Sequence, residues 1–173
     1  QKDHDRGFNF NTHLSFDFAI TKHLNARLFG SYSFTTLENA IFQPTWTEAQ
    51  GKMYRRENKN EDFLGSIQLN YNNTWGVHKL DLTATAEHQN NRKQFFFTTV
   101  KGLASNAFGY DNLMVGNIHP YKGTSSGYES PKLTSFMGNL SYTLLNRYAL
   151  SLTLRADGST LVGHNNTWGF FPS

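Results

Sequence analysis

The chain has 173 residues and a net charge of +3. Its 16 Lys and Arg are spread along the chain rather than clustered, and this distribution argues against nucleic-acid binding. No run of about 18 apolar residues occurs, which excludes a transmembrane helix. There is no cysteine, which excludes disulfides, thiol catalysis and thiolate metal sites, and only 38% of residues are hydrophobic although 15% are aromatic.

Apolar residues recur with a period of two along most of the chain, the pattern typical of β-strands. The first predicted strand runs from Phe8 to Ile20 and the second covers 26–35. The third spans 62–75, the fourth about 79–87, the fifth about 133–145, and the sixth lies in the stretch NRYALSLTLRADGS from Asn146. Roughly ten residues are enough for a tilted strand to cross a bilayer, so all six reach the required length.

The predicted connections alternate strictly between short and long. Only a few residues join strands one to two, three to four and five to six, whereas 37–61 and about 90–132 form long loops. Outer-membrane β-barrels have short periplasmic turns and long extracellular loops. This sorting favours a membrane barrel over a soluble sandwich, whose turns have mixed lengths at both ends.

One face of the predicted strands is too highly charged for a soluble core, because buried charges are costly unless paired. We therefore expect the apolar face to meet lipid and the polar face to line a lumen. A soluble antiparallel sheet with one solvated face remains an alternative. The charged residues predicted to face the lumen are Arg27, Asp81, Glu87, Arg155 and Asp157, and Asp17 shares their face.

Six strands cannot close a barrel, since the smallest single-chain barrels have eight. An open sheet would leave two edges that lipid cannot satisfy. We expect residues 1–173 to be an internal segment of a longer barrel domain. The polar start, QKDHDR, predicts that any export signal lies outside this sequence.

The last 35 residues of the chain carry a recognisable pattern, NLSYTLLNRYALSLTLRADGST followed by GHNNTWGFFPS. It resembles the SusC/RagA family of TonB-dependent outer-membrane transporters of Bacteroidetes, with a strand pair leading into R-x-D-G-S and then N-N-x-W-G-x-F-P-S. The stretch LGSIQLNYNNTWGVHKLDLTATAEHQ is similar to the hairpin before it in that family. The resemblance implies a partial all-β transmembrane antiparallel β-barrel, about six strands of a larger plugged barrel, whose plug and remaining strands lie elsewhere.

The resemblance also implies active import of a glycan, oligosaccharide or peptide across the bacterial outer membrane. Its expected partners are a SusD-like surface lipoprotein, the TonB–ExbB–ExbD system acting through parts not in this sequence, and the lipid bilayer. Two other classes stay open: a passive porin or adhesin barrel, and a soluble sugar-binding β-sandwich. No catalytic constellation stands out and the seven histidines lack metal-ligand spacing, so we expect no enzyme activity, cofactor or metal.

Loops on a rigid scaffold commonly carry recognition, so the two predicted long loops supply the candidate ligand or partner residues. Each ring taken singly fits loop packing or an interfacial girdle as well as ligand contact. Trp168 joins them from the polar, aromatic tail, which we interpret as a turn region at the mouth. The candidates are Trp46, Tyr54, Arg55, Arg56, Phe95, Phe96, Phe97, Tyr110, Asp111, Tyr121 and Trp168.

Overall fold

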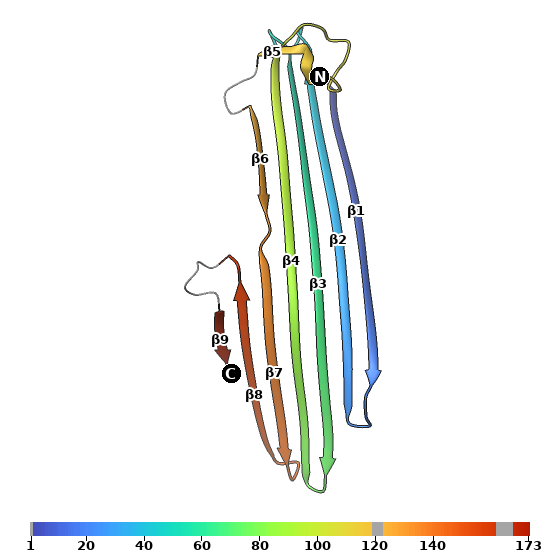
Figure 1. The fold of residues 1–173 in the computed structure, drawn as a ribbon, viewed down its shortest axis with the longest axis vertical. Coiled ribbons are helices and arrows are strands. Elements are labelled where there is room, and N and C mark those ends of the chain that lie inside the picture. Colours follow the sequence, from blue (N-terminus) through green and yellow to red (C-terminus); the bar gives the residue numbers. More distant parts are fainter. Residues whose placement is uncertain (1, 119–122, 162–167) are drawn as a thin grey trace. The chain divides into compact units, whose positions relative to one another are not determined.

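The computed structural model describes residues 2–118, 123–161 and 168–173. Within these residues nine strands form one sheet in the order β1-β2-β3-β4-β7-β8-β9, with β5 and β6 paired to β4 (Figure 1). The elements are β1 (Lys2–Ala19), β2 (Leu24–Gln43), β3 (Lys52–Trp75), β4 (His78–Leu103), the 3-10 turn η1 (Leu113–Val115), β5 (Gly116–Ile118), β6 (Thr124–Glu129), β7 (Lys132–Leu144), β8 (Tyr148–Ser159) and β9 (Trp168–Pro172).

The sheet divides into two compact units, and each of the four long strands contributes a portion to both. Unit 1 comprises Gln1–Phe10, Ser33–Glu61 and Arg92–Ser130, and unit 2 comprises Asn11–Tyr32, Asp62–Asn91 and Pro131–Ser173. The units differ in composition along the same strands: unit 2 alternates apolar with polar residues, and unit 1 carries charged residues on both sides of its strands.

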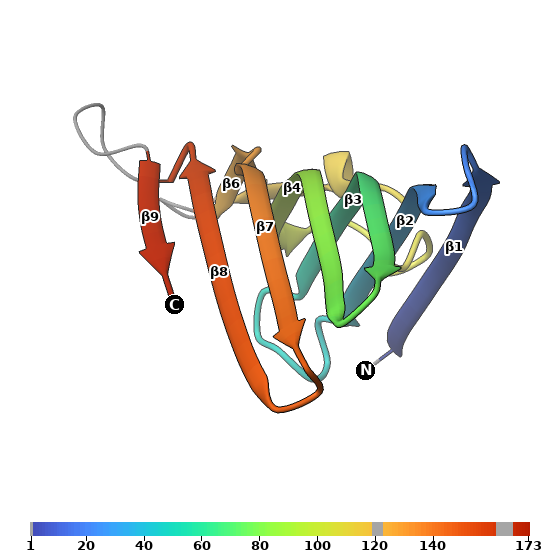
Figure 2. The ribbon, with the colours of Figure 1, turned by 90° about the horizontal axis from the view of Figure 1, so that it is seen from below.

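Unit 2 holds three short turns, which Figure 2 shows between β1 and β2, β3 and β4, and β7 and β8. Gly76, at φ +59°, is half of the two-residue connection after β3. The turn after β7 places Leu145 and Asn146 at φ +55° each. Two consecutive residues with positive φ match the right-handed twist of a hairpin, although leucine rarely adopts that conformation.

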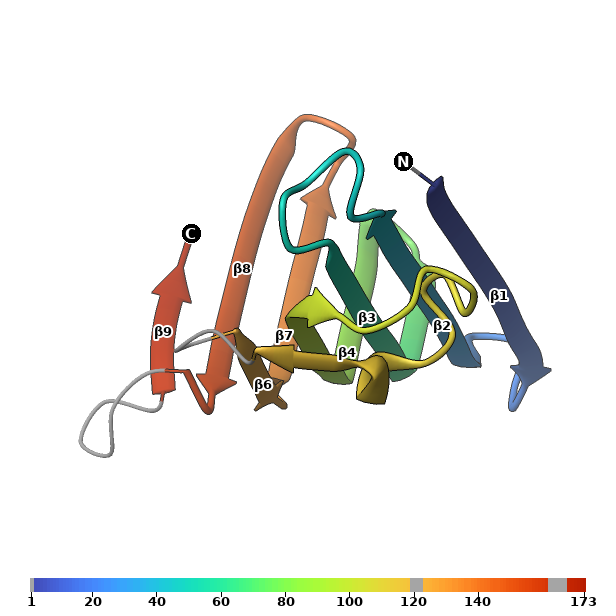
Figure 3. The ribbon, with the colours of Figure 1, turned by 90° about the horizontal axis from the view of Figure 1, so that it is seen from above.

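Unit 1 has a small apolar core built by a segment that returns across the ends of its strands (Figure 3). Met53, Phe42 and Leu103 are buried there, and Tyr110, Leu113 and Val115 pack against them from the segment after β4. The Leu103 amide donates to the Gln50 carbonyl at 2.9 Å, and the Ala104 amide to the Val115 carbonyl at 2.9 Å. Backbone bonds and apolar packing therefore fix this crossing segment together.

The predicted strand positions are confirmed, but their lengths and the loop boundaries are wrong. β1 starts at Lys2 instead of Phe8, and the predicted loops 37–61 and 90–132 are largely strand, since β2 extends to Gln43, β3 starts at Lys52 and β4 runs to Leu103. These portions escape detection because neither of their faces is uniformly apolar. Backbone pairing holds these portions in the sheet, and it does not depend on side-chain type, so it leaves no period of two in the sequence.

The interpretation of the tail as a turn region is also wrong in part. Trp168–Pro172 forms β9, antiparallel to β8, with Arg155 opposite Phe171 and Gly158 opposite Trp168. This segment has only five residues, and two of them are glycine and proline. Its alternation is therefore too short to predict a strand from the sequence.

Candidate functional site

One face of unit 2 is a continuous exposed band of apolar side chains. The register sets Ala86, Phe136, Ala156 and Phe170 side by side on four strands, and Leu82, Leu140 and Leu152 form a parallel row. Phe136 is 50% exposed and Leu154 54%. An apolar surface of this extent on a water-soluble monomer would be unusual, and it fits contact with a membrane or a partner.

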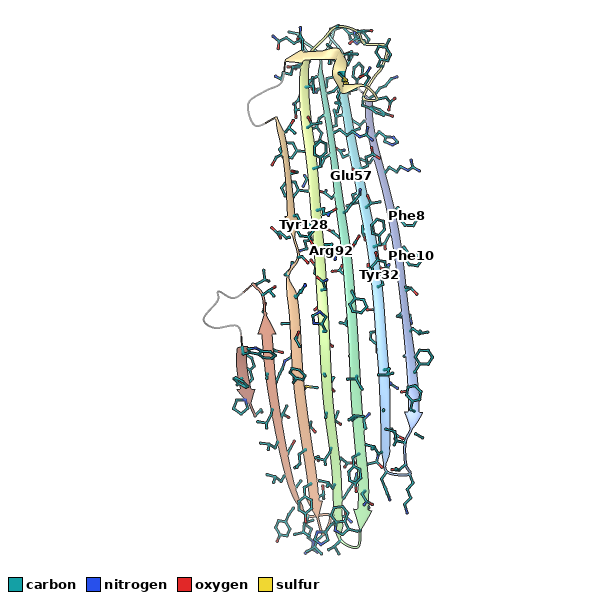
Figure 4. All side chains as sticks on the ribbon, in the orientation of Figure 1. Phe8, Phe10, Tyr32, Glu57, Arg92 and Tyr128 are labelled. Carbon is teal, nitrogen blue, oxygen red and sulfur yellow. The ribbon has the colours of Figure 1, made fainter. Side chains whose placement is uncertain are left out.

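Aromatic rings bound this band at the short turns. Trp75 stacks on His78 at 5.8 Å between centroids, and His78 stacks on Tyr142 at 6.0 Å. His78 Nδ1 also lies 2.6 Å from the Tyr142 hydroxyl. Figure 4 shows rings gathered around the turns after β3 and β7. Amphipathic rings of this kind prefer the boundary between hydrocarbon and water.

Trp168 bounds the same band at its other end. Its indole stacks on Phe136, with centroids 6.0 Å apart, and covers Gly158, where a Cβ would lie 2.9 Å from the ring. At about 3.4 Å per residue, the path along β7 from Thr134, opposite Gly158, to Leu144, opposite Tyr148, is about 34 Å, and a strand tilt of about 40° reduces it to a height of about 26 Å. This height matches the apolar band of outer-membrane barrels, about 25 Å.

The opposite face of unit 2 carries the charges predicted to face a lumen. Arg27 Nε lies 2.6 Å from Asp17 Oδ1, Arg155 Nε lies 2.7 Å from Asp157 Oδ2, and Lys79 Nζ lies 3.6 Å from Asp81 Oδ2. Glu87 stands opposite Ser135, which stands opposite Asp157. The structure thus brings the five predicted residues onto one face, where Arg27, Asp81, Arg155 and Asp157 belong to ion pairs. That this face lines a lumen stays a prediction.

The candidate ligand residues predicted in loops lie instead in strands of unit 1, on alternate sides. Tyr54 pairs with Phe97 at 6.3 Å between ring centroids, and alternation puts Arg56 and Phe95 on their side. Arg55 and Phe96 point to the other side, and Arg55 pairs there with Glu38. The predicted set therefore cannot act as one cluster. Its members were grouped because they are close in the sequence. In a strand, however, successive side chains point to opposite faces.

A groove of about 450 Å³ lies on the Phe96 side, between β3, β4 and β6. Lys59 Nζ lies 2.8 Å from Glu57 Oε1, and the hydrogen bond to this carboxylate raises the pKa of the Lys59 ammonium, which stays charged at neutral pH. Tyr128 is 59% exposed, and Figure 4 marks it with Glu57. The lining is Glu57, Lys59, Gln94, Phe95, Phe96, Ser126, Gly127 and Tyr128.

Sequence reasoning missed most of this groove because β6 joins it only through tertiary pairing. Gln94 stands opposite Tyr128 and Phe96 opposite Ser126, although these partners lie far apart in the chain. The short strand Thr124–Glu129 has no apolar alternation from which it could have been predicted.

The remaining candidates are scattered. Trp46 is 78% exposed in the connection after β2, and Tyr110 stacks on His4 with centroids 5.4 Å apart. Asp111 lies in the crossing segment, where its amide donates to the Phe108 carbonyl at 3.1 Å. Tyr121 lies outside the described residues. Trp168 faces the apolar side of unit 2, so its predicted position in a ligand-contacting loop is wrong.

In the described ranges no helix is both long and apolar enough to cross a membrane. The same ranges contain no group of three or more His, Asp or Glu placed to hold a metal ion.

No family model matches the chain. Among curated proteins, it is 30% identical over 110 residues to TonB-dependent receptor P3 of Formosa agariphila, covering 64% of this chain and 11% of that protein. It is 51% identical over 41 residues to TonB-dependent receptor SusC of Bacteroides thetaiotaomicron, covering 24% of this chain and 4% of that one. The chain resembles a SusC/RagA-type barrel segment. It spans about a tenth or less of the length of these two relatives.

Solved structures agree on the fold. A chain in a structure of the RagAB peptide transporter superposes with a TM-score of 0.88 at 15% identity, covering 99% of this chain and 20% of that one. A chain of the RagAB peptide importer in the closed-closed state gives a TM-score of 0.86 at 14% identity. The fold predicted from the sequence, an antiparallel sheet that forms part of a larger β-barrel, is confirmed.

Proposed function

We propose that the full-length protein imports a nutrient across the bacterial outer membrane by TonB-dependent active transport, and that residues 1–173 form part of its barrel wall. The observation that carries this proposal is the two-faced sheet of unit 2. Its apolar face is bounded by rings at both ends and its opposite face carries ion pairs, in a chain similar to TonB-dependent receptors.

Each face of unit 2 has a distinct role in this proposal. The apolar band meets lipid, where every backbone polar group must be bonded, and the antiparallel ladders that join β4, β7, β8 and β9 bond the facing groups of these strands. The ion pairs line a hydrated interior, where their charges need no burial.

We further propose that a SusD-like lipoprotein works with this protein and that the imported nutrient is a glycan or a peptide. The relatives named SusC and RagAB support these assignments, and the RagAB structures are described as those of a peptide transporter or importer. The aromatic and polar lining of the groove between Glu57 and Tyr128 suits both nutrient classes, since rings pack on sugar or side-chain surfaces while amide and charged groups bond to them.

Uptake by cells that express the full-length gene tests the proposal. A strain lacking the gene should lose growth at limiting concentrations of one glycan or peptide mixture, and should recover it with the wild-type gene. Because active import draws energy from the inner membrane, deletion of TonB should abolish the recovered growth. Growth that persists without TonB would instead identify a passive porin.

A second expectation concerns the unit 1 groove. In the full-length protein, Tyr128→Ala and Phe96→Ala should each weaken binding of the nutrient identified by the growth experiment by about threefold to tenfold, since ring packing contributes about 0.5–1.5 kcal/mol. Phe97→Ala is the matched control, because its ring packs with Tyr54 on the other side of the strands. Equal losses in all three variants, measured by calorimetric titration, would contradict a specific role for the groove.

A further inference from the structure

The apolar face of unit 2 is hollowed along its middle. A groove of about 670 Å³ passes over β3, β4, β7, β8 and β9, and a second of about 430 Å³ continues it. The two share Leu69, Ala84, Gly138 and Leu154, so they form one furrow, here called the lipid-face furrow. Apolar side chains supply nearly all of its lining.

Small residues make the floor of the furrow, and large ones make its walls. Ala84 stands opposite Gly138, and Ala156 stands between Phe136 and Phe170. A Cβ built at Gly138 would have no heavy atom within 4 Å, so the space above this glycine is open. A furrow with this lining, in a wall that meets lipid, must be filled by something apolar, because water would find few hydrogen-bond partners there.

A cation lies beyond the Trp168 end of the furrow, outside the furrow's lining. On the same face of β7 as Phe136, Lys132 lies opposite Asn90 with an exposed side chain, and among the described residues it makes no ion pair. His88 stands opposite Thr134, which lies midway between Lys132 and Phe136 in β7, and His88 Nδ1 is 2.9 Å from the Thr134 hydroxyl. The described carboxylates of unit 2 all lie on the other, polar face: Asp17, Asp62, Asp81, Glu87 and Asp157.

We propose that the lipid-face furrow binds one acyl chain of a phosphate-bearing lipid of the outer leaflet, with the phosphate held at Lys132. This inference rests on the proposed placement of the sheet in the outer membrane. Charge complementarity selects the occupant: an apolar furrow with the Lys132 cation beyond its Trp168 end, on a face where unit 2 has no described carboxylate, fits a lipid whose headgroup is anionic. Trp168, at the level where indole rings prefer to lie, sets the depth of the headgroup. A polypeptide would find no partners in the furrow for its backbone polar groups.

The test uses the full-length protein purified in detergent, with lipid A, its dephosphorylated form and phosphatidylethanolamine as probes. Native mass spectrometry should show that wild type prefers lipid A to the dephosphorylated form by about tenfold, the usual value of one charge-assisted bond. Gly138→Leu, which fills the open space, should lower lipid A binding at least tenfold. Lys132→Gln should make binding of the two forms equal.

Two matched variants serve as controls. Gly30→Leu adds the same side chain at a glycine of β2 that also has open space above its Cβ but does not line the furrow. Lys22→Gln removes a cation in the turn between β1 and β2. Both should bind lipid A as wild type does.

Three outcomes would overturn the inference. One is equal lipid A binding by Gly138→Leu and Gly30→Leu, and another is an unchanged phosphate preference in Lys132→Gln. The third is a change of oligomeric state in Gly138→Leu without loss of lipid A, which would assign the furrow to contact between copies. If the protein inserts and transports yet shows any of these results, only this inference fails; a protein that folds and stays in water would refute the proposed function as well.

Discussion

Replacing Leu152 by arginine is expected to lower the free energy of unfolding of the full-length protein in lipid vesicles by about 2–4 kcal/mol. Leu152 stands opposite Leu140, which stands opposite Leu82, midway between the ring clusters that bound the apolar band. It is 45% exposed, so in the bilayer its side chain contacts lipid. An arginine at this depth places its charged guanidinium in the hydrocarbon of the bilayer, which costs free energy. Urea-dependent unfolding, followed by tryptophan fluorescence in vesicles, measures the change.

Ser151→Arg is the control for this prediction. Ser151 precedes Leu152 in β8 and stands opposite Ser141 on the polar face, where the added charge stays hydrated near existing ion pairs. We expect its free energy of unfolding to change by less than about 0.5 kcal/mol. If Ser151→Arg destabilised the protein more than Leu152→Arg, the assignment of the two faces would be reversed.

Replacing Met53 by alanine is expected to cost about 2–5 kcal/mol in the stability of the unit 1 core. Met53 is 0% exposed and packs with Phe42 and Leu103, under the segment that crosses the strand ends. The cavity left by alanine would persist because the Ala104 amide bonds to the Val115 carbonyl and holds Val115 in place. Hydrogen exchange of the amides in the crossing segment, between Leu103 and Val115, should accelerate by about thirtyfold or more.

Met114→Ala gives the matched comparison. Met114 is 91% exposed in the same crossing segment, so its removal deletes no packing. Exchange in this variant should equal that of wild type. A similar acceleration in both variants would mean that methionine loss acts on the unfolded chain and not on the core.

The residues that alternate cleanly were assigned correctly from sequence. The leucines of β8 and the phenylalanines of β1 reveal their strands because one face of unit 2 is apolar and the other polar. That contrast produces apolar residues at every second position of the sequence. The charged residues Arg27, Asp81, Glu87, Arg155 and Asp157 were placed on one face by the same rule. The portions in unit 1 have no such contrast, so β3 around Arg55 and β4 around Phe96 were interpreted as loops.

The sequence by itself determined the strand periodicity, the two faces of unit 2 and the short turns, because each depends on neighbours a few residues apart. Only the tertiary structure decided which residues meet across strands. It paired Thr124–Glu129 with β4, laid Trp168 on Phe136, split the ring candidates of unit 1 onto opposite sides, and aligned Ala84, Gly138 and Ala156 into a furrow floor. Those relations depend on register, which long-range backbone pairing sets and local composition does not encode.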